Sequence, residues 1–132
     1  MKKFSLLILI VTLLFATKTF SQDYTSFEVE NVSNEIAINA INQTLSDLNL
    51  GGHIWKNQNA TETNFYNYST LIAKNRLKLK VMVENNKLTV SIFNRQYKSN
   101  GNWVDNPMPM NKKQAAKVLK PIKKRFMELV KK

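Results

Sequence analysis

The chain has 132 residues, 20 Lys and Arg against 9 Asp and Glu, and a formal net charge of +11. That length accommodates one compact domain. The absence of cysteine excludes a disulfide framework, a thiolate metal site and a cysteine nucleophile. With 43% hydrophobic residues and three glycines, the chain is neither wholly disordered nor collagen-like. Composition therefore predicts a small basic globular domain.

Residues 1–21 have the pattern of a secretory signal peptide. Two lysines precede a mainly apolar run over residues 4–16, which is shorter than the roughly 20 residues that a membrane-spanning helix needs. Small residues predict cleavage between Ser21 and Gln22; a retained N-terminal anchor is the alternative. Nothing later in the sequence is apolar enough to span a bilayer. We therefore expect residues 22–132 to form a single extracytoplasmic domain, in the periplasm or the medium.

The first part of the mature chain predicts a strand followed by a helix. Apolar and acidic residues alternate over residues 27–30, which is typical of a short strand. Ser33 is a candidate N-cap for a helix over about 34–49, whose apolar residues recur every three or four positions. Gly51 and Gly52 are expected to end this helix, because glycine tolerates the left-handed conformation.

The next segment predicts short strands and loops. Residues 53–55 could form a short strand, and residues 57–64 form a polar loop. Aromatic and β-branched residues favour a strand over 65–74, with a turn at Asn75 and Arg76.

Residues 77–93 predict a β-hairpin with a defined register. Apolar and polar residues alternate on both sides of Asn85 and Asn86, which suit the two central positions of a type I′ turn. Glu84 then pairs with Lys87. Three apolar pairs share one face in this register: Val83 with Leu88, Val81 with Val90, and Leu79 with Ile92. A shift by one residue would break all three pairs.

A loop over residues 99–111 and a closing helix complete the domain. Asn111 is a candidate N-cap, the apolar residues after it have helical spacing, and Pro121 should kink the helix. The element order is β-α-β-β-β-β-α. This order predicts an α+β fold, in which an antiparallel sheet of four to five strands packs against two amphipathic helices.

In this order, the elements resemble those of small secreted domains from Bacteroidetes with a TBP-like α+β fold. The resemblance rests on the signal ending Phe20-Ser21-Gln22, the helix before Gly51-Gly52, the hairpin turn and the closing helix from Lys112. It implies a curved antiparallel sheet. It implies no activity, because the function of that family is unknown and a fold does not fix a function.

Few residues could support catalysis. His53 is the only histidine, which excludes a multi-histidine metal site, and its neighbours Ile54 and Trp55 favour a structural role. The acidic residues show no spacing typical of a glycosidase or metal site, and no phosphate loop or nucleophile motif is present. We therefore expect a non-enzymatic protein without a metal or cofactor. An enzyme with an unrecognised carboxylate site is an alternative.

The positive charge is concentrated in two segments. The signal contributes +3, whereas residues 22–111 contain eight bases and eight acids and are neutral. Residues 112–132 carry nine bases and one acid, and therefore the whole +8 of the mature chain. These bases are Lys112, Lys113, Lys117, Lys120, Lys123, Lys124, Arg125, Lys131 and Lys132.

The basic closing helix has two interpretations. It could bind anionic lipid, lipopolysaccharide or an acidic protein, or it could be a solvated face that keeps the domain soluble. The function that we expect is a secreted or periplasmic binding module that contacts anionic envelope surfaces through this helix. A partner-specific inhibitor or assembly factor is the alternative.

The outer face of the hairpin is a second candidate surface. Its residues are Lys78, Lys80, Phe93, Arg95 and Tyr97. Aromatic side chains among bases can stack on single-stranded nucleic acid, but a secretory signal argues against that partner. Alternatively, the aromatics lie under a loop that contains Trp103, Met108 and Met110, as a second small hydrophobic cluster.

Overall fold

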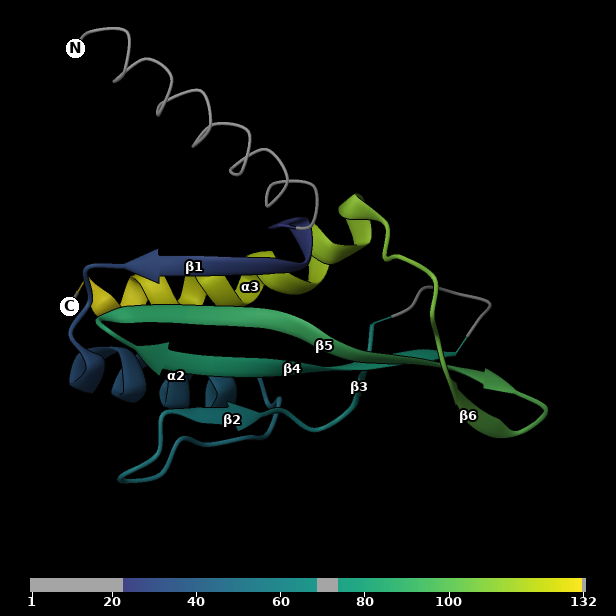
Figure 1. The fold of residues 1–132 in the computed structure, drawn as a ribbon, viewed down its shortest axis with the longest axis horizontal. Helices are drawn as coiled ribbons and strands as arrows, with labels where there is room; N and C mark the ends of the chain where they lie inside the picture. Colours follow the sequence, from purple (N-terminus) through teal and green to yellow (C-terminus); the bar gives the residue numbers. More distant parts are fainter. Residues whose placement is uncertain (1–22, 69–73, 132) are drawn as a thin grey trace, which may run out of the picture.

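The computed structural model describes residues 23–68 and 74–131 (Figure 1). The predicted signal peptide, residues 69–73 of one predicted strand, and Lys132 lie outside these ranges. The described elements are η1 (Asp23–Thr25), β1 (Ser26–Glu30), α2 (Asn34–Asp47), β2 (Ala60–Glu62), β3 (Tyr66–Asn67), β4 (Asn75–Glu84), β5 (Lys87–Ser99), β6 (Asn102–Asp105) and α3 (Lys112–Val130). Within the described ranges, no helix is long and apolar enough to cross a membrane.

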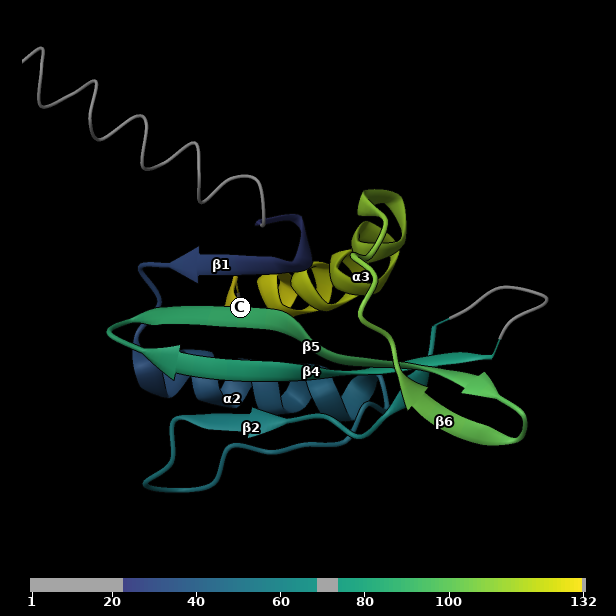
Figure 2. The same cartoon turned by 45° about the vertical axis from the view of Figure 1, so that its right-hand side comes forward.

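The strands form one antiparallel sheet with both α-helices on the same face (Figures 1 and 2). The order is β1-β5-β4-β2 in the main part, while β3 pairs with β4 and β6 with β5 at the far end. The predicted α+β architecture is confirmed, with six strands in place of four to five. We call the far end, where β3 and β6 flank the hairpin, the arm.

The hydrophobic core lies between the helices and the sheet. Ile41 and Leu45 of α2, Leu79 and Val81 of β4, and Phe126 of α3 are all fully buried in one cluster. These residues come from the apolar stripes that the sequence predicts, because burying such stripes is what holds helices on a sheet.

The β4–β5 hairpin has the predicted register. Glu84 pairs with Lys87, and the three apolar pairs form as expected on the core face. Asn85 and Asn86 have φ angles of 54° and 60°, as a type I′ turn requires. The prediction is confirmed in each pair because the turn and the apolar alternation favour the same register.

A β-bulge interrupts this hairpin beyond the last predicted pair. Leu79 pairs with Ile92, but Lys78 pairs with Asn94, so Phe93 is an extra residue on β5. A bulge leaves one residue unpaired and shifts the alternation of side chains after it. The faces of β5 beyond Phe93 therefore differ from those that simple alternation predicts.

Both helices begin at the predicted caps. The Ser33 hydroxyl accepts a hydrogen bond from the backbone N–H of Ile36 at 3.3 Å, and the Asn111 side chain accepts one from the N–H of Lys113 at 2.7 Å. Helix α3 is continuous through Pro121, and its first turns are inclined to the rest (Figure 2).

The end of α2 differs from the prediction. The helix ends at Asp47, and Asn49, with a φ of 57°, takes the left-handed position that the sequence predicts for the glycines. Asparagine tolerates this conformation because its short polar side chain can bond locally. Gly51 and Gly52 lie beyond the helix end, in the connection to β2.

Three local assignments in the middle of the chain are wrong. Residues 53–55 form no strand, and β2 lies inside the predicted loop over 57–64. Strand β2 forms because it pairs with the backbone of the neighbouring β4. Its own sequence has no alternation of apolar and polar residues that would predict a strand. Asn75 and Arg76 begin β4 and form no turn, because both pair with β5 and Arg76 also pairs with β3.

The predicted loop over 99–111 contains a strand. Asn100 and Gly101 have φ angles of 50° and 81° and reverse the chain between β5 and β6. Asn-Gly is among the strongest short hairpin signals, so the sequence contained the information needed to place β6.

Candidate functional site

Six lysines of α3 and its C-cap Lys131 are exposed: Lys112, Lys113, Lys117, Lys120, Lys123, Lys124 and Lys131. At about 100° per residue, five of them fall within roughly 60° of one another around the helix axis. These five form the lysine stripe, which consists of Lys113, Lys117, Lys120, Lys124 and Lys131. The stripe lies opposite the buried side of α3, which carries Ala115, Val118, Leu119, Ile122 and Phe126.

The lysine stripe faces solvent without acidic partners. None of its lysines takes part in an ion pair with another residue of the described ranges. On the flank, the ammonium of Lys123 lies 5.9 Å from the centre of the Phe27 ring. The stripe therefore presents a line of uncompensated positive charge along the outside of the helix.

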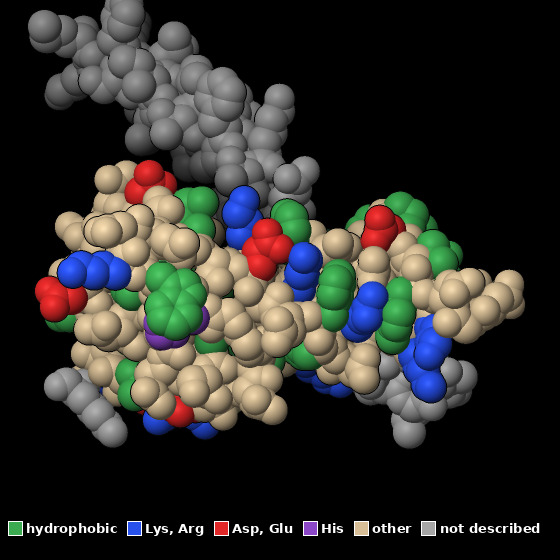
Figure 3. Space-filling model, turned by 90° about the horizontal axis from the view of Figure 1, so that it is seen from below, with side chains coloured by type: hydrophobic (Ala, Val, Ile, Leu, Met, Phe, Trp, Pro, Cys, Tyr) green, Lys and Arg blue, Asp and Glu red, His purple; other side chains and the backbone are tan. Residues whose placement is uncertain are grey.

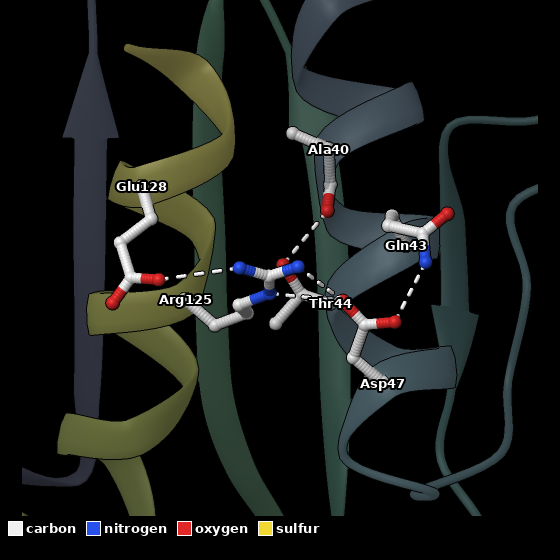
Figure 4. A network of polar contacts seen from close by, with 6 residues as sticks. All are labelled: Ala40, Gln43, Thr44, Asp47, Arg125 and Glu128. Carbon is white, nitrogen blue, oxygen red and sulfur yellow. Dashed lines mark hydrogen bonds and ion pairs between the residues drawn. The ribbon is translucent and has the colours of Figure 1, made fainter. Parts of the chain in front are cut away.

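Arg125 has a different role from the lysines of the closing helix. Its Nη2 lies 2.8 Å from Oδ2 of Asp47, and its Nε donates to the same oxygen at 2.9 Å (Figure 4). Its Nη1 contacts Oε2 of Glu128 at 3.2 Å. Arg125 therefore joins α3 to α2 and is partly buried at their contact, so its charge is already matched.

The ion pair between Arg125 and Asp47 makes stability depend on acidic pH. A hydrogen bond from Gln43, at 2.6 Å, and the Arg125 guanidinium both lower the pKa of Asp47 below 3.8. A carboxylate with a lowered pKa in the folded state stabilises that state above its unfolded pKa of about 3.9. That stabilisation is lost as the pH falls through the folded pKa.

We expect Asp47→Asn to be less stable than the parent protein at neutral pH, with the difference shrinking below about pH 4. Urea unfolding at a series of pH values measures this difference. Glu30→Gln, which removes an exposed carboxylate from β1, is the control and should show a smaller difference. A stability difference for Asp47→Asn that is independent of pH would contradict the assignment.

A row of alternating cations and rings lies on the other face of the sheet. Arg76, Lys78 and Lys80 alternate on β4 with buried leucines and a valine, so they point away from the helices. Figure 3 shows basic and hydrophobic side chains alternating along a line toward the arm. We call this the cation–aromatic row. In order, its members are Lys80, Phe93, Lys78, Phe65, Arg76, Trp103 and Lys98.

Each ring in the row contacts two cations. The Phe93 ring centre lies 5.7 Å from Lys80 Nζ and 5.8 Å from Lys78 Nζ. The Phe65 ring centre lies 5.1 Å from Lys78 Nζ and 4.3 Å from Arg76 Cζ. The Trp103 ring centre lies 4.2 Å from Arg76 Cζ and 5.6 Å from Lys98 Nζ. All these distances are within the range of cation–π attraction.

The sequence predicts only part of this row. Lys78, Lys80 and Phe93 lie in it as expected. The expectation that Arg95 and Tyr97 share this face is wrong, because after the bulge they pair with residues on the core-side face. The remaining members are Phe65, which directly precedes β3, Arg76 of β4, Lys98 of β5 and Trp103 of β6; strand pairing beyond the bulge and the Asn-Gly turn bring them together.

The expected second hydrophobic cluster does not form. Met110 is 3% exposed and packs in the main core, whereas Met108 is 67% exposed. Trp103 lies against Arg76, and Phe93 is half exposed beside the lysines. The aromatics of the hairpin are therefore stacked with cations and are not covered by the loop.

Two acids converge in one shallow hollow near the hairpin turn. Glu30 and Glu84 line a cavity of about 400 Å³ together with Lys87, whose ammonium lies 3.7 Å from Glu28. Both carboxylates are exposed to water. Acid–base catalysis benefits from a water-excluded site that holds its groups in place, and this hollow does not supply one. No group of three or more potential metal ligands occurs in the described ranges.

Comparison with known proteins gives a match in structure. No model of a known protein family matches the sequence, and no curated protein sequence matches it significantly. The crystal structure of a TBP-like protein from Parabacteroides distasonis is similar, with a TM-score of 0.54, 13% identity, and coverage of 80% of this chain and 90% of that one. The fold is TBP-like. At such low identity the TBP-like similarity concerns the fold alone, so a function must be argued from the surface of this chain.

Proposed function

We propose that this protein is a non-enzymatic binding module that acts outside the cytoplasm and contacts anionic surfaces of the cell envelope. The lysine stripe of α3 is the observation that carries the proposal, because the fold directs its charges outward and gives them no acidic partners among the described residues. The pattern of a secretory signal over residues 1–21 supports the location.

The burial of α3 determines how the stripe would contact a membrane. Amphipathic helices that insert into a bilayer use their apolar face, but the apolar face of α3 is occupied by the core. The contact would therefore be electrostatic and peripheral. A lysine near an anionic surface contributes about 1 kcal/mol, and salt screens this attraction over about 10 Å at 0.1 M.

Replacing Lys117, Lys120 and Lys124 with Gln should weaken binding to vesicles containing phosphatidylglycerol by about 100-fold at low salt. Co-sedimentation with these vesicles and with phosphatidylcholine vesicles measures the effect. The parent protein should bind the anionic vesicles only, and salt should release it.

The matched control replaces Lys56, Lys74 and Lys87 with Gln, which removes the same charge from outside α3. It should change binding much less than the α3 variant. Equal binding of the parent protein to both kinds of vesicle would refute the proposal. So would an equal loss in the two triple variants, because net charge alone would then explain binding.

A further inference from the structure

We propose that the cation–aromatic row is a second binding site, which takes an extended acidic peptide with Asp or Glu at every second residue. The row lies on the sheet face opposite α2 and α3, so it is separate from the lysine stripe.

Arg76 at the middle of the row is held in place. Its guanidinium lies between the rings of Phe65 and Trp103, at 4.3 and 4.2 Å, and its Nε donates to Oε1 of Gln96 at 2.8 Å. The Arg76 side chain is therefore ordered before a ligand binds, so binding costs less conformational entropy than it would for a mobile arginine. A preorganised cation is a better binding group than a free surface lysine.

The contacts within the row indicate which ligands fit it. Sequence-tolerant binding of single-stranded nucleic acid depends on bases stacking on open aromatic faces. Phe65 and Trp103 each have cations over the ring, so the surface left to a ligand consists mainly of N–H groups and ring edges. Ring edges are the positive part of the aromatic quadrupole. This surface favours anionic oxygen atoms over flat bases.

The spacing of the cations matches an extended peptide. Arg76, Lys78 and Lys80 are two residues apart on one strand, so they repeat at about 6.8 Å. A peptide in extended conformation repeats the side chains of one face with the same period. Acids at alternate positions would therefore face the cations one to one, whereas half of a continuous acidic run would point away.

The charge of the row is only partly compensated. Glu62 on β2 contacts Lys78 at 2.9 Å, and Asp105 accepts a hydrogen bond from Gln96, the partner of Arg76. These two acids face four cations. The side chain of Glu62 is 44% exposed, and exposed ion pairs are weak, so an incoming carboxylate can compete for Lys78.

The test compares two fluorescently labelled peptides of about ten residues. One alternates Glu and Thr, and the other has the same composition in the order Glu-Glu-Thr-Thr-Glu-Glu-Thr-Thr-Glu-Thr, so that no two Glu lie two residues apart. Fluorescence anisotropy at low salt should show at least about tenfold tighter binding of the alternating peptide. The double variant Arg76→Gln/Lys78→Gln should lose about tenfold or more, while Lys117→Gln/Lys124→Gln, with the same charge loss on α3, should change binding less than about twofold.

A second variant controls for loss of binding through misfolding. Lys80→Gln/Lys98→Gln removes the ends of the row and leaves the stacked Arg76 in place, so it should weaken the alternating peptide by a smaller factor while keeping the parent unfolding curve. Equal binding of the two peptides overturns the inference. Tighter binding of oligothymidylate or of a sulfated polysaccharide than of the alternating peptide also overturns it, in favour of that ligand. Neither result affects the vesicle experiment, which tests α3.

Discussion

Replacing Phe126 with alanine is expected to destabilise the domain by about 3–5 kcal/mol. The ring is 0% exposed and lies on the side of α3 that faces the core. Its removal takes away buried apolar surface and leaves a cavity that the close-packed neighbours fill only in part. Domains of this size are stable by only about 5–15 kcal/mol, so the loss is a large fraction of the total. Urea denaturation followed by circular dichroism measures it.

The Phe126→Ala variant also tests whether docking on the sheet stabilises α3. Like charges three or four residues apart destabilise a helix, so the lysine stripe disfavours α3 unless the helix docks on the sheet. Lys124→Ala, two residues from Phe126 on the opposite side, is the control and should change stability by less than about 0.5 kcal/mol. A loss below about 1 kcal/mol for Phe126→Ala would contradict the packing described for α3.

Gly52→Ala is expected to cost about 2–4 kcal/mol. Gly52 has a φ of +86°, and a Cβ there would lie 2.7 Å from the backbone oxygen of Glu62. That oxygen belongs to β2 and cannot move away easily, because the adjacent Thr63 bonds through its hydroxyl to the N–H of Leu79 at 2.8 Å. The alanine would therefore combine an unfavourable backbone conformation with a close contact. Thermal unfolding of the variant measures the cost.

Gly101→Ala separates the two contributions. Gly101 also has a positive φ, +81°, but a Cβ there would have no atom within 4 Å. This variant should show only the backbone cost, about 1–2 kcal/mol. Equal losses in the two variants would show that the approach of Gly52 to β2 adds nothing.

The parts of the fold that the sequence predicts are those fixed by local patterns. The hairpin register follows from alternation around Asn85 and Asn86, and the two helices follow from apolar periodicity and their caps. Local signals of this kind need no knowledge of distant residues. Strand β2 is different, because its three residues, Ala60, Thr61 and Glu62, are aligned by β4 and carry no pattern of their own.

The two candidate surfaces also differ in how far local sequence patterns predict them. The lysine stripe lies on one helix, so helical geometry is enough to assemble it from the sequence. The cation–aromatic row joins Phe65, Arg76, Phe93 and Trp103 from four separate segments. Its assembly depends on the Phe93 bulge, for which the sequence shows no glycine or proline, and on the placement of β6. The sequence does not distinguish Arg125 from the lysines of the closing helix, because only the structure shows Asp47 opposite it.

The bulge at Phe93 gives the outer face of the hairpin one side chain that the core does not require. The flanking residues Ile92 and Asn94 pair with Leu79 and Lys78, which are adjacent on β4. The ladder of pairs therefore continues past Phe93 with its register shifted by one residue. Its ring therefore contacts Lys78 and Lys80 without belonging to any pair that holds the sheet together. A substitution at this position would therefore change the chemistry of the surface without changing the packing of the interior.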